Sequence, residues 1–574
     1  MTVLADPPPP VDNTWAAPAV AVPATLAIAV VVFLLVRAVR GGIRDQGDFL
    51  LAGRRIGPGQ NALALAAAPL MYSTLFIITG HVALSGYDAV LLLTSFTMSM
   101  MLGVLLFASH MRNLGATTLG DVFAMRARER PARIAASVVT LTIYAMFTVI
   151  TLAAIAFILN RWFGLDSLVG LAGSVLVVGL VTVLYVYMGG MPGVTRLLTF
   201  KAVVALGVVA MLTTLVLVKF DFNLVRLLDT AEARSAPQGD YDLLGPGRLF
   251  GEGSDRWVHL SKLFCVVVGV AAIPFLFMRN FAVTNGPDAR RSAGWAAMIV
   301  VAVYACMAVV GLGSVAVLGR ENIGVIKAHR DISLPKLADE LGGPLMVGAL
   351  GAVAVLTVAG VFAALLINAV TCVTRDVNAL RGRRPAPGRE LADVRRNVMI
   401  VGIVSVVGGV AMLPVRTHIF IPTSIDVAGA TILPVVVYAL FWRRFNTAGL
   451  KWAVYGGLAS TMFMVVFSNG MSGAEDAIFA GSDFKFIDIE PGLISVPLAF
   501  LLGFLGTVLS GERDDAAFAE IQVRSLTGAV VPARRGASVG AVLDVGGNGR
   551  DVNRGDGNGR DGDGRANRTT SEAR

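Results

Sequence analysis

The sequence predicts an all-helical integral membrane protein, and three observations point to this class. Hydrophobic residues make up 55% of the 574-residue chain, whereas charged residues make up only 15%. The mean hydropathy of +0.71 lies far above the range of soluble globular proteins. The apolar residues gather in about thirteen stretches, each long enough for a helix of roughly twenty residues to cross a bilayer. These features exclude a soluble enzyme.

The first predicted helix covers residues 18–36, and an arginine cluster follows it. Residues 1–14 contain no Lys or Arg, so the chain start lacks the basic region of a cleaved signal peptide. By the positive-inside rule, a cluster directly after the first helix faces the cytoplasm. We therefore expect residues 1–17 to be extracellular. The cluster consists of Arg37, Arg40, Arg44, Arg54 and Arg55.

Further apolar stretches of about twenty residues recur as far as residue 510. If each crosses once, the arginine-rich connectors fall on the cytoplasmic side in alternation, and the chain ends inside the cell. Residues 18–510 are therefore predicted to form one transmembrane domain. Residues 511–574 are polar and of low complexity, which predicts a largely disordered cytoplasmic tail. The further spans are predicted at residues 59–83, 88–109, 133–159, 166–188, 196–218, 258–278, 292–318, 343–372, 397–414, 421–442, 449–469 and 491–510.

Other classes of function find little support in the sequence. The net charge of +9 resides mostly in short connectors between spans, which indicates membrane topology rather than nucleic-acid binding. Cys265, Cys306 and Cys372 show no CxxC or histidine spacing, so neither a disulfide framework nor a metal site is predicted. Phosphate-binding loops and HExxH motifs are absent from the sequence, and no cofactor is expected. A transporter, a channel or a sensor remains, and the short polar tail disfavours a sensor.

The second span carries the first local sign of a transporter. Pro69 stands in the middle of this span and is followed by Tyr72, Ser73 and Thr74. Proline removes a backbone donor and clashes with the preceding turn, so it can break a helix. Carbonyls released at such a break can bind a small cation near the bilayer midplane. A plain proline kink in a core helix is the alternative interpretation.

Four segments of the chain have an informative sequence, order and spacing. They are Asp48–Arg54, Thr118–Asp121, Gly189–Thr195 with Lys201, and Pro274–Val283 with Asp288–Ser292. On these segments the chain resembles the sodium:solute symporter family, and most of all its cation/acetate (monocarboxylate) symporter branch. The resemblance extends from about Gly47 to Gly528, and its order and spacing are more specific than any single motif. It implies about thirteen helices, with a core of two five-helix repeats of inverted topology that each begin with a broken helix.

The resemblance also implies where a coupling cation binds, between the second and ninth helices. The implied ligands are the carbonyls of Ala66 and Pro69 and the ninth-helix residues Thr357, Gly360 and Val361. Of these ninth-helix residues only Thr357 has a side-chain oxygen, where relatives carry more hydroxyl groups, so we expect a weak sodium site. Polar residues of the family are also replaced at Ala68, Thr151, Leu198 and Phe275. The candidates for the substrate path are Ala68, Tyr72, Ser73, Thr74, Thr151 and Phe275.

Asp426 is a carboxylate about six residues into the eleventh predicted span, where a charged group is costly and marks a candidate functional site. One hypothesis makes Asp426 a protonatable coupling group. The alternative places it near the outer headgroups, at a helix start that favours negative charge.

We therefore expect a secondary transporter, not an enzyme, in the plasma membrane. It would carry out symport of a small organic anion, such as acetate or another short monocarboxylate, with Na⁺ or H⁺. Two alternatives are proton-coupled or uncoupled transport of another small solute, and a non-transporting paralogue that acts as a partner subunit. The expected partners are the solute and membrane lipids, without nucleic acid.

Overall fold

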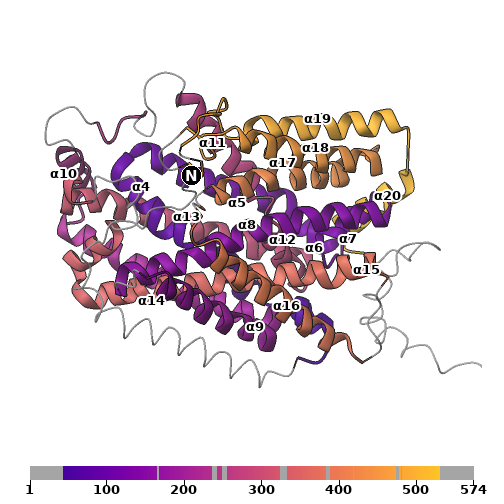
Figure 1. The fold of residues 1–574 in the computed structure, drawn as a ribbon, viewed down its shortest axis with the longest axis horizontal. Coiled ribbons are helices and arrows are strands. Elements are labelled where there is room, and N and C mark those ends of the chain that lie inside the picture. The colour runs from indigo at the N-terminus through magenta and orange to yellow at the C-terminus, as the bar shows by residue number, and fades with distance from the viewer. Residues whose placement is uncertain are drawn as a thin grey trace, which may run out of the picture. The chain divides into compact units, whose positions relative to one another are not determined.

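The computed structural model describes residues 43–163, 167–235, 242–247, 255–323, 333–382, 388–415, 417, 419–473, 477–479 and 481–529. Within these ranges the named elements are all helices, and many of the long ones run side by side along the horizontal axis of Figure 1. The all-helical class is therefore confirmed. The predicted helix at 18–36, the segment 1–17 and the tail from residue 530 lie outside the described residues.

The first half of the bundle contains a broken helix and the longest of the described helices. The broken helix consists of α3 and α4, joined by a π-helical turn at Ser73–Ile77. A second π-helical turn, Val104–Ala108, joins α5 to α6. The helices are α2 (Gln46–Leu51), α3 (Pro58–Ala67), α4 (Ile78–Ser85), α5 (Tyr87–Gly103), α6 (Ser109–Asn113), α7 (Leu119–Ala124), α8 (Glu129–Phe163) and α9 (Leu168–Lys219).

The second half contains another broken helix, in which α11 and α12 are separated at residues 271–273. The helices are α10 (Leu224–Ser235), α11 (Asp255–Val270), α12 (Pro274–Phe281), α13 (Gly286–Leu318), α14 (Ser333–Cys372), α15 (Asn378–Leu380), α16 (Glu390–Ala411), α17 (Phe420–Phe441), α18 (Thr447–Val466), α19 (Gly492–Ser510) and α20 (Asp515–Thr527). Among the described residues, 10 helices are long and apolar enough to cross a membrane. They account for the predicted spans from 88 onward, while the total of thirteen stays a prediction.

The long helix α9 contains two predicted spans and folds back at Gly190. Its 52 residues would extend about 78 Å at 1.5 Å per residue, more than twice the hydrocarbon thickness of a bilayer. Gly190 has φ +49° and ψ −152°, a conformation outside the helical region. The hydroxyl of Tyr185 donates to the carbonyl of Gly193 at 2.6 Å across this turn. We call Leu168–Gly189 the first arm of α9 and Met191–Lys219 the second arm.

This division gives two units of five crossings each within the described residues. The first unit consists of α3 with α4, α5, α8 and the two arms of α9; the second consists of α11 with α12, α13, α14, α16 and α17. An odd number of crossings brings the chain to the opposite membrane face, so the second unit starts from the other side. The five-plus-five core with broken helices is therefore confirmed.

Glycines allow the helices of this core to approach closely. A methyl group at Gly179 of the first arm would lie 2.7 Å from Val406 of α16, and one at Gly402 of α16 would lie 2.6 Å from Val183. A methyl group at Gly269 of α11 would lie 2.3 Å from the carbonyl oxygen of Ile425 of α17. Such contacts between small residues are how helices associate in a membrane.

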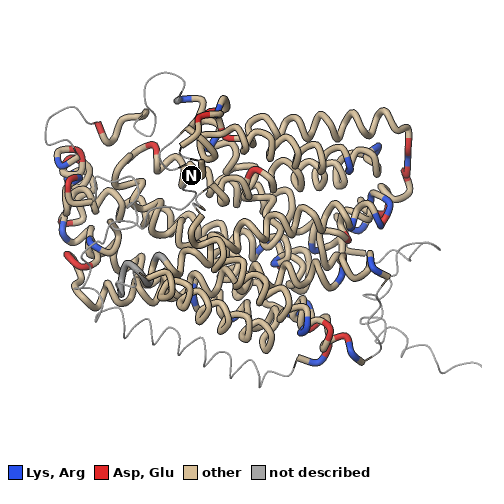
Figure 2. The backbone as a smooth tube through the Cα atoms, viewed as in Figure 1, with Lys and Arg blue, Asp and Glu red and all other residues tan. Residues whose placement is uncertain are grey.

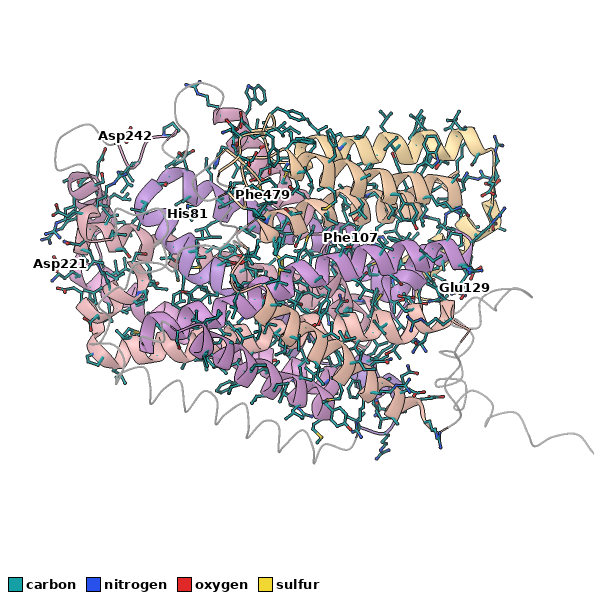
Figure 3. All side chains as sticks on the ribbon, viewed as in Figure 1. His81, Phe107, Glu129, Asp221, Asp242 and Phe479 are labelled. Carbon is teal, nitrogen blue, oxygen red and sulfur yellow. The ribbon has the colours of Figure 1, made fainter. Side chains whose placement is uncertain are left out.

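Charged residues concentrate at the two ends of the helices, and the middle of the bundle is mostly free of them (Figure 2). Asp221 and Glu129 mark opposite ends in Figure 3, whereas Phe107 lies between them. Several helices lie outside the predicted spans. Among them are α10, which follows α9, and α20, which forms within the segment 511–574 that the sequence predicts to be largely disordered.

Candidate transport site

The break between α3 and α4 is the centre of the candidate site. Helix α3 ends at Ala67, and Pro69 has no N–H to continue it. The backbone N–H of Met71 turns back to the carbonyl of Pro69 at 2.8 Å, and the hydroxyl of Thr74 donates to the same carbonyl at 3.1 Å. These two hydrogen bonds fix the short irregular segment between α3 and α4.

Lys201 on the second arm of α9 fills the space beside this break. Its ammonium Nζ donates to the carbonyls of Ala67 at 2.8 Å and Leu70 at 2.5 Å. These carbonyls each follow by one residue those of Ala66 and Pro69, which were the predicted cation ligands. Lys201 is only 1% exposed. A side-chain cation therefore sits at the place where the sequence predicts a cation site.

Helix α14 forms the opposite wall of this place. Gly360 is buried, and a methyl group there would lie 3.4 Å from Cδ of Lys201 and 3.2 Å from Leu198. Thr357 and Val361 are also buried, and the hydroxyl of Thr357 has no hydrogen-bond partner among the described residues. The structure thus brings the predicted residues of the second and ninth helices to opposite sides of Lys201.

Aromatic side chains border the two breaks. Phe275, in the first turn of α12, makes a perpendicular ring contact with Phe147 of α8 at 6.0 Å. Thr151 lies one turn beyond Phe147 and donates its hydroxyl to the Phe147 carbonyl at 2.6 Å. Tyr72 stacks on Phe76 at 4.6 Å. Among the other predicted path residues, Ala68 and Thr74 are buried and Ser73 is half-buried.

Arg279 of α12 is a second buried cation, which the sequence analysis missed. It is 1% exposed, and its Nη1 donates to the hydroxyl of Thr195 on the second arm at 2.7 Å. Its Nη2 has no hydrogen-bond partner among the described residues. Thr195 and Lys201 are six residues apart on one helix, about 9 Å along its axis. The second arm of α9 is therefore in contact with one buried cation and carries another.

Asp426 lies apart from these cations, between α11, α17 and α19. It is 2% exposed, and within the described residues neither carboxylate oxygen has a hydrogen-bond partner of good geometry. A methyl group at Gly492 would lie 2.6 Å both from Oδ1 of Asp426 and from Sγ of Cys265. The carboxyl group is thus enclosed by protein.

A cluster of charged side chains connects α7, α8 and the segment that follows α14. Arg133 of α8 forms ion pairs with Asp376 at 2.6 Å, Asp121 at 3.0 Å and Glu129 at 3.0 Å. Asp376, in the π-helical turn Val373–Val377, also accepts from the hydroxyl of Thr118 at 2.9 Å. A cavity of about 10 Å³, near the smallest size that holds a water, adjoins Asp376 and the first turns of α12.

Sequence patterns contained signals for some of these features. Pro274, inside the span 258–278 and four residues from its end, was a signal for the second break, which was expected only from the resemblance. Lys201, inside the span 196–218, is an intramembrane cation and thus a candidate functional residue by its position alone. No group of three or more metal-ligating side chains occurs in the described part of the chain, and Cys265, Cys306 and Cys372 are free.

Comparisons with known proteins agree with this arrangement. Residues 49–458 match the family model described as sodium:solute symporter family. A protein named monocarboxylic acid transporter from Corynebacterium glutamicum is 32% identical over 513 residues, covering 87% of this chain and 93% of the relative. An uncharacterized symporter, YwcA of Bacillus subtilis, is 28% identical over 490 residues, covering 84% of this chain and 94% of the relative.

Two solved structures share the fold. One is a substrate-bound, outward-open sodium-coupled sialic acid symporter, with a TM-score of 0.68, 15% identity, and coverage of 87% of this chain and 99% of that one. The other is MhsT in complex with L-phenylalanine, with a TM-score of 0.50, 12% identity, and coverage of 79% and 99%. Since the family model matches more than half of the chain and the relatives extend over most of it, the chain belongs to the sodium:solute symporter family and is a membrane transporter, not an enzyme.

Proposed function

We propose that the protein carries out cation-coupled symport of a short monocarboxylate, such as acetate, across the plasma membrane. The observation that carries this proposal is the 32% identity, over nearly the whole of both chains, to a relative named as a monocarboxylic acid transporter. A shared solute class is a fair inference at this identity, because the match covers 87% of this chain and 93% of the relative. We further propose that the chain begins outside the cell and ends inside, as the arginine-rich connectors indicate.

A buried arginine of the described core favours an anionic solute. Arg279 is fully buried, it forms no ion pair with a carboxylate among the described residues, and its Nη2 has no hydrogen-bond partner there. A buried cation without a counter-charge is unfavourable. A carboxylate solute that passes near Arg279 lowers this cost, whereas a cationic solute would raise it.

The dimensions of the candidate path favour a small solute. The side chains at the two breaks are packed closely: Phe147 contacts Phe275, Tyr72 stacks on Phe76, and Ala68 is fully buried. Two half-helices also begin beside these side chains: one starts at Tyr72 and continues through the π-helical turn into α4, and the other is α12, which starts at Pro274. Helix starts attract carboxylate groups. A short monocarboxylate has both the charge and the size that such a place accommodates.

The direct test is uptake into proteoliposomes of the purified protein. Labelled pyruvate is a better probe than labelled acetate, because uncharged acetic acid crosses a bilayer unaided, whereas pyruvic acid is a stronger acid and is almost fully ionised near neutral pH. We expect uptake above that of protein-free liposomes, and inhibition by unlabelled acetate and propionate but not by glucose or L-proline. Inhibition by a neutral sugar or amino acid instead of by monocarboxylates would refute the proposed solute class.

A further inference from the structure

Lys201 lies where the helix break releases backbone carbonyls. In an unbroken helix the carbonyl of Ala67 would accept from the N–H of Met71, but that N–H donates to Pro69. The ammonium of Lys201 takes this place at 2.8 Å and also binds the carbonyl of Leu70 at 2.5 Å. Carbonyl oxygens at a discontinuous helix are typical ligands of a coupling cation. The ammonium therefore has the surroundings of a bound metal cation, but it is covalently attached to the chain.

The ammonium has no carboxylate partner within the described residues, and α3 contributes no titratable side chain at all. The nearest charged side chain on α9 itself is Arg196, and Arg279 of α12 reaches only as far as Thr195. The other titratable side chains of α9 are Tyr185, Tyr187 and Lys219. The described elements that pack against α9 contribute Asp48 of α2, Arg54 beside it, Glu129, Arg130, Arg133 and Tyr144 of α8, Asp288, Arg290, Arg291, Tyr304 and Cys306 of α13, Lys336, Asp339, Glu340 and Cys372 of α14, and Glu390, Asp393, Arg395 and Arg396 of α16.

The opposite wall, formed by α14, lies close to the Lys201 side chain. A methyl group at Gly360 would lie 3.4 Å from Cδ of Lys201, at the limit of van der Waals contact. The hydroxyl of Thr357 is the one side-chain oxygen among Thr357, Gly360 and Val361. A metal ion at the same carbonyls would also be repelled by the ammonium at short range, where little water screens the two charges. Occupation by Lys201 and occupation by a free cation are thus mutually exclusive.

We propose that protonated Lys201 takes the place of the free coupling cation, so that solute transport is driven by protons and does not require sodium. This inference rests on the proposed function. Lysine is suited to the role because its ammonium carries a full charge and can also give up its proton when buried. In each cycle the lone pair of the neutral amine takes a proton from hydronium on the side of uptake, and the ammonium returns it to water on the side of release. One proton crosses for each such cycle, and no bond to carbon changes.

The test uses the full chain in proteoliposomes with labelled pyruvate, after subtraction of uptake by protein-free liposomes. One arm imposes an inside-alkaline pH gradient, with N-methylglucamine in place of sodium on both sides. A second arm imposes an inward sodium gradient at equal pH, and a third imposes no gradient. We expect accumulation in the first arm alone. Accumulation driven by sodium at equal pH overturns the inference while leaving the proposed function intact, whereas no uptake in any arm overturns both.

Variants of Lys201 test whether this side chain is the group that couples solute accumulation to the pH gradient. Lys201→Gln removes the charge, and Lys201→Arg keeps a cation that does not release its proton in proteins. We expect both to lower pH-driven accumulation by about tenfold or more, while exchange of labelled for unlabelled pyruvate without a gradient continues. The matched control is Lys219→Gln, an exposed lysine at the end of the same helix, which should leave accumulation unchanged.

Two variants are used in case one of them fails to fold. If Lys201→Gln unfolds, Lys201→Arg still offers N–H donors to the two carbonyls and keeps the test valid. Elution from a gel-filtration column and the exchange assay show whether each variant is folded. Normal pH-driven accumulation by a folded Lys201→Gln or Lys201→Arg protein overturns the inference. Loss of exchange together with accumulation, in both folded variants, does so as well, because it assigns Lys201 to solute binding rather than to coupling.

Discussion

Arg133 of α8 donates a hydrogen bond of 2.6 Å to Asp376, although the two residues are 243 positions apart in the chain. Both side chains are nearly inaccessible to solvent, with exposed fractions of 5% and 1%. The pair joins the first five-helix unit to the second at one end of the bundle. Asp121 and Glu129 add further negative charge around the same guanidinium.

Replacement of Arg133 by Met should therefore destabilise the protein strongly. Removing one partner of a buried ion pair leaves the other charge uncompensated, which costs about 3 kcal/mol or more. The midpoint of thermal unfolding in detergent should fall clearly, and a second change, Asp376→Asn, should restore part of it. Arg226→Met is the matched control, because its pair with Asp221 is exposed on both sides and such pairs contribute about 1 kcal/mol at most. Equal effects of the two arginine replacements would contradict this account.

Gly190→Ala should disrupt the turn between the two arms of α9. A side chain at φ +49° is strained, at a cost of about 1–3 kcal/mol, and the new methyl group would lie 2.7 Å from the carbonyl oxygen of Phe49. We expect lower yield of folded protein and a lower unfolding midpoint. Gly207→Ala is the control within the same helix, since a methyl group there meets nothing within 4 Å and should be neutral or stabilising. An unchanged midpoint for Gly190→Ala would mean that the turn has another conformation.

Arg126→Met should loosen the attachment of α20. The guanidinium of Arg126 donates to the carbonyls of Arg443 at 2.7 Å and Phe445 at 2.9 Å, just after α17 ends, and to that of Asp514 at 3.0 Å, just before α20 begins. Hydrogen bonds to a charged group are worth roughly 1.5–3 kcal/mol each. We expect faster amide hydrogen exchange throughout α20, with little change in α9. Arg128→Met, at a side chain that is 75% exposed, should not alter the exchange of α20.

Asp426→Asn should leave the pH dependence of uptake unchanged if Lys201 is the coupling residue. The amide keeps the shape of the carboxyl group and removes a charge that is enclosed by α11, α17 and α19. The unfolding midpoint should be equal or higher, because a buried carboxylate without a good partner is costly. The measurement is pyruvate uptake between pH 5.5 and 8, a range of about two to three pH units around neutrality. A shifted or flattened pH profile would assign proton coupling to Asp426 instead.

The sequence predicted the fold well because its signals are local. Apolar length indicates each span, and Pro69 indicates the first break, so both could be recognised without knowledge of packing. The partners of the buried charges could not be recognised in this way. Lys201 binds carbonyls 131 and 134 residues earlier in the chain, and Arg133 meets Asp376 across the two units. Such contacts depend on how distant helices pack, which no local pattern records.

The turn at Gly190 has a mechanical consequence for the transport cycle. A single non-helical residue, Gly190, separates the two arms of α9, so no flexible loop lies between them. The first arm is packed tightly against α16 through Gly179 and Gly402, while the second arm carries Lys201. A displacement of α16 along its axis would therefore move the first arm, and through the turn at Gly190 it would also move the second arm that carries Lys201. Substitutions at the interface of α16 with the first arm, remote from the helix break, should change the tightness of coupling rather than the affinity for the solute.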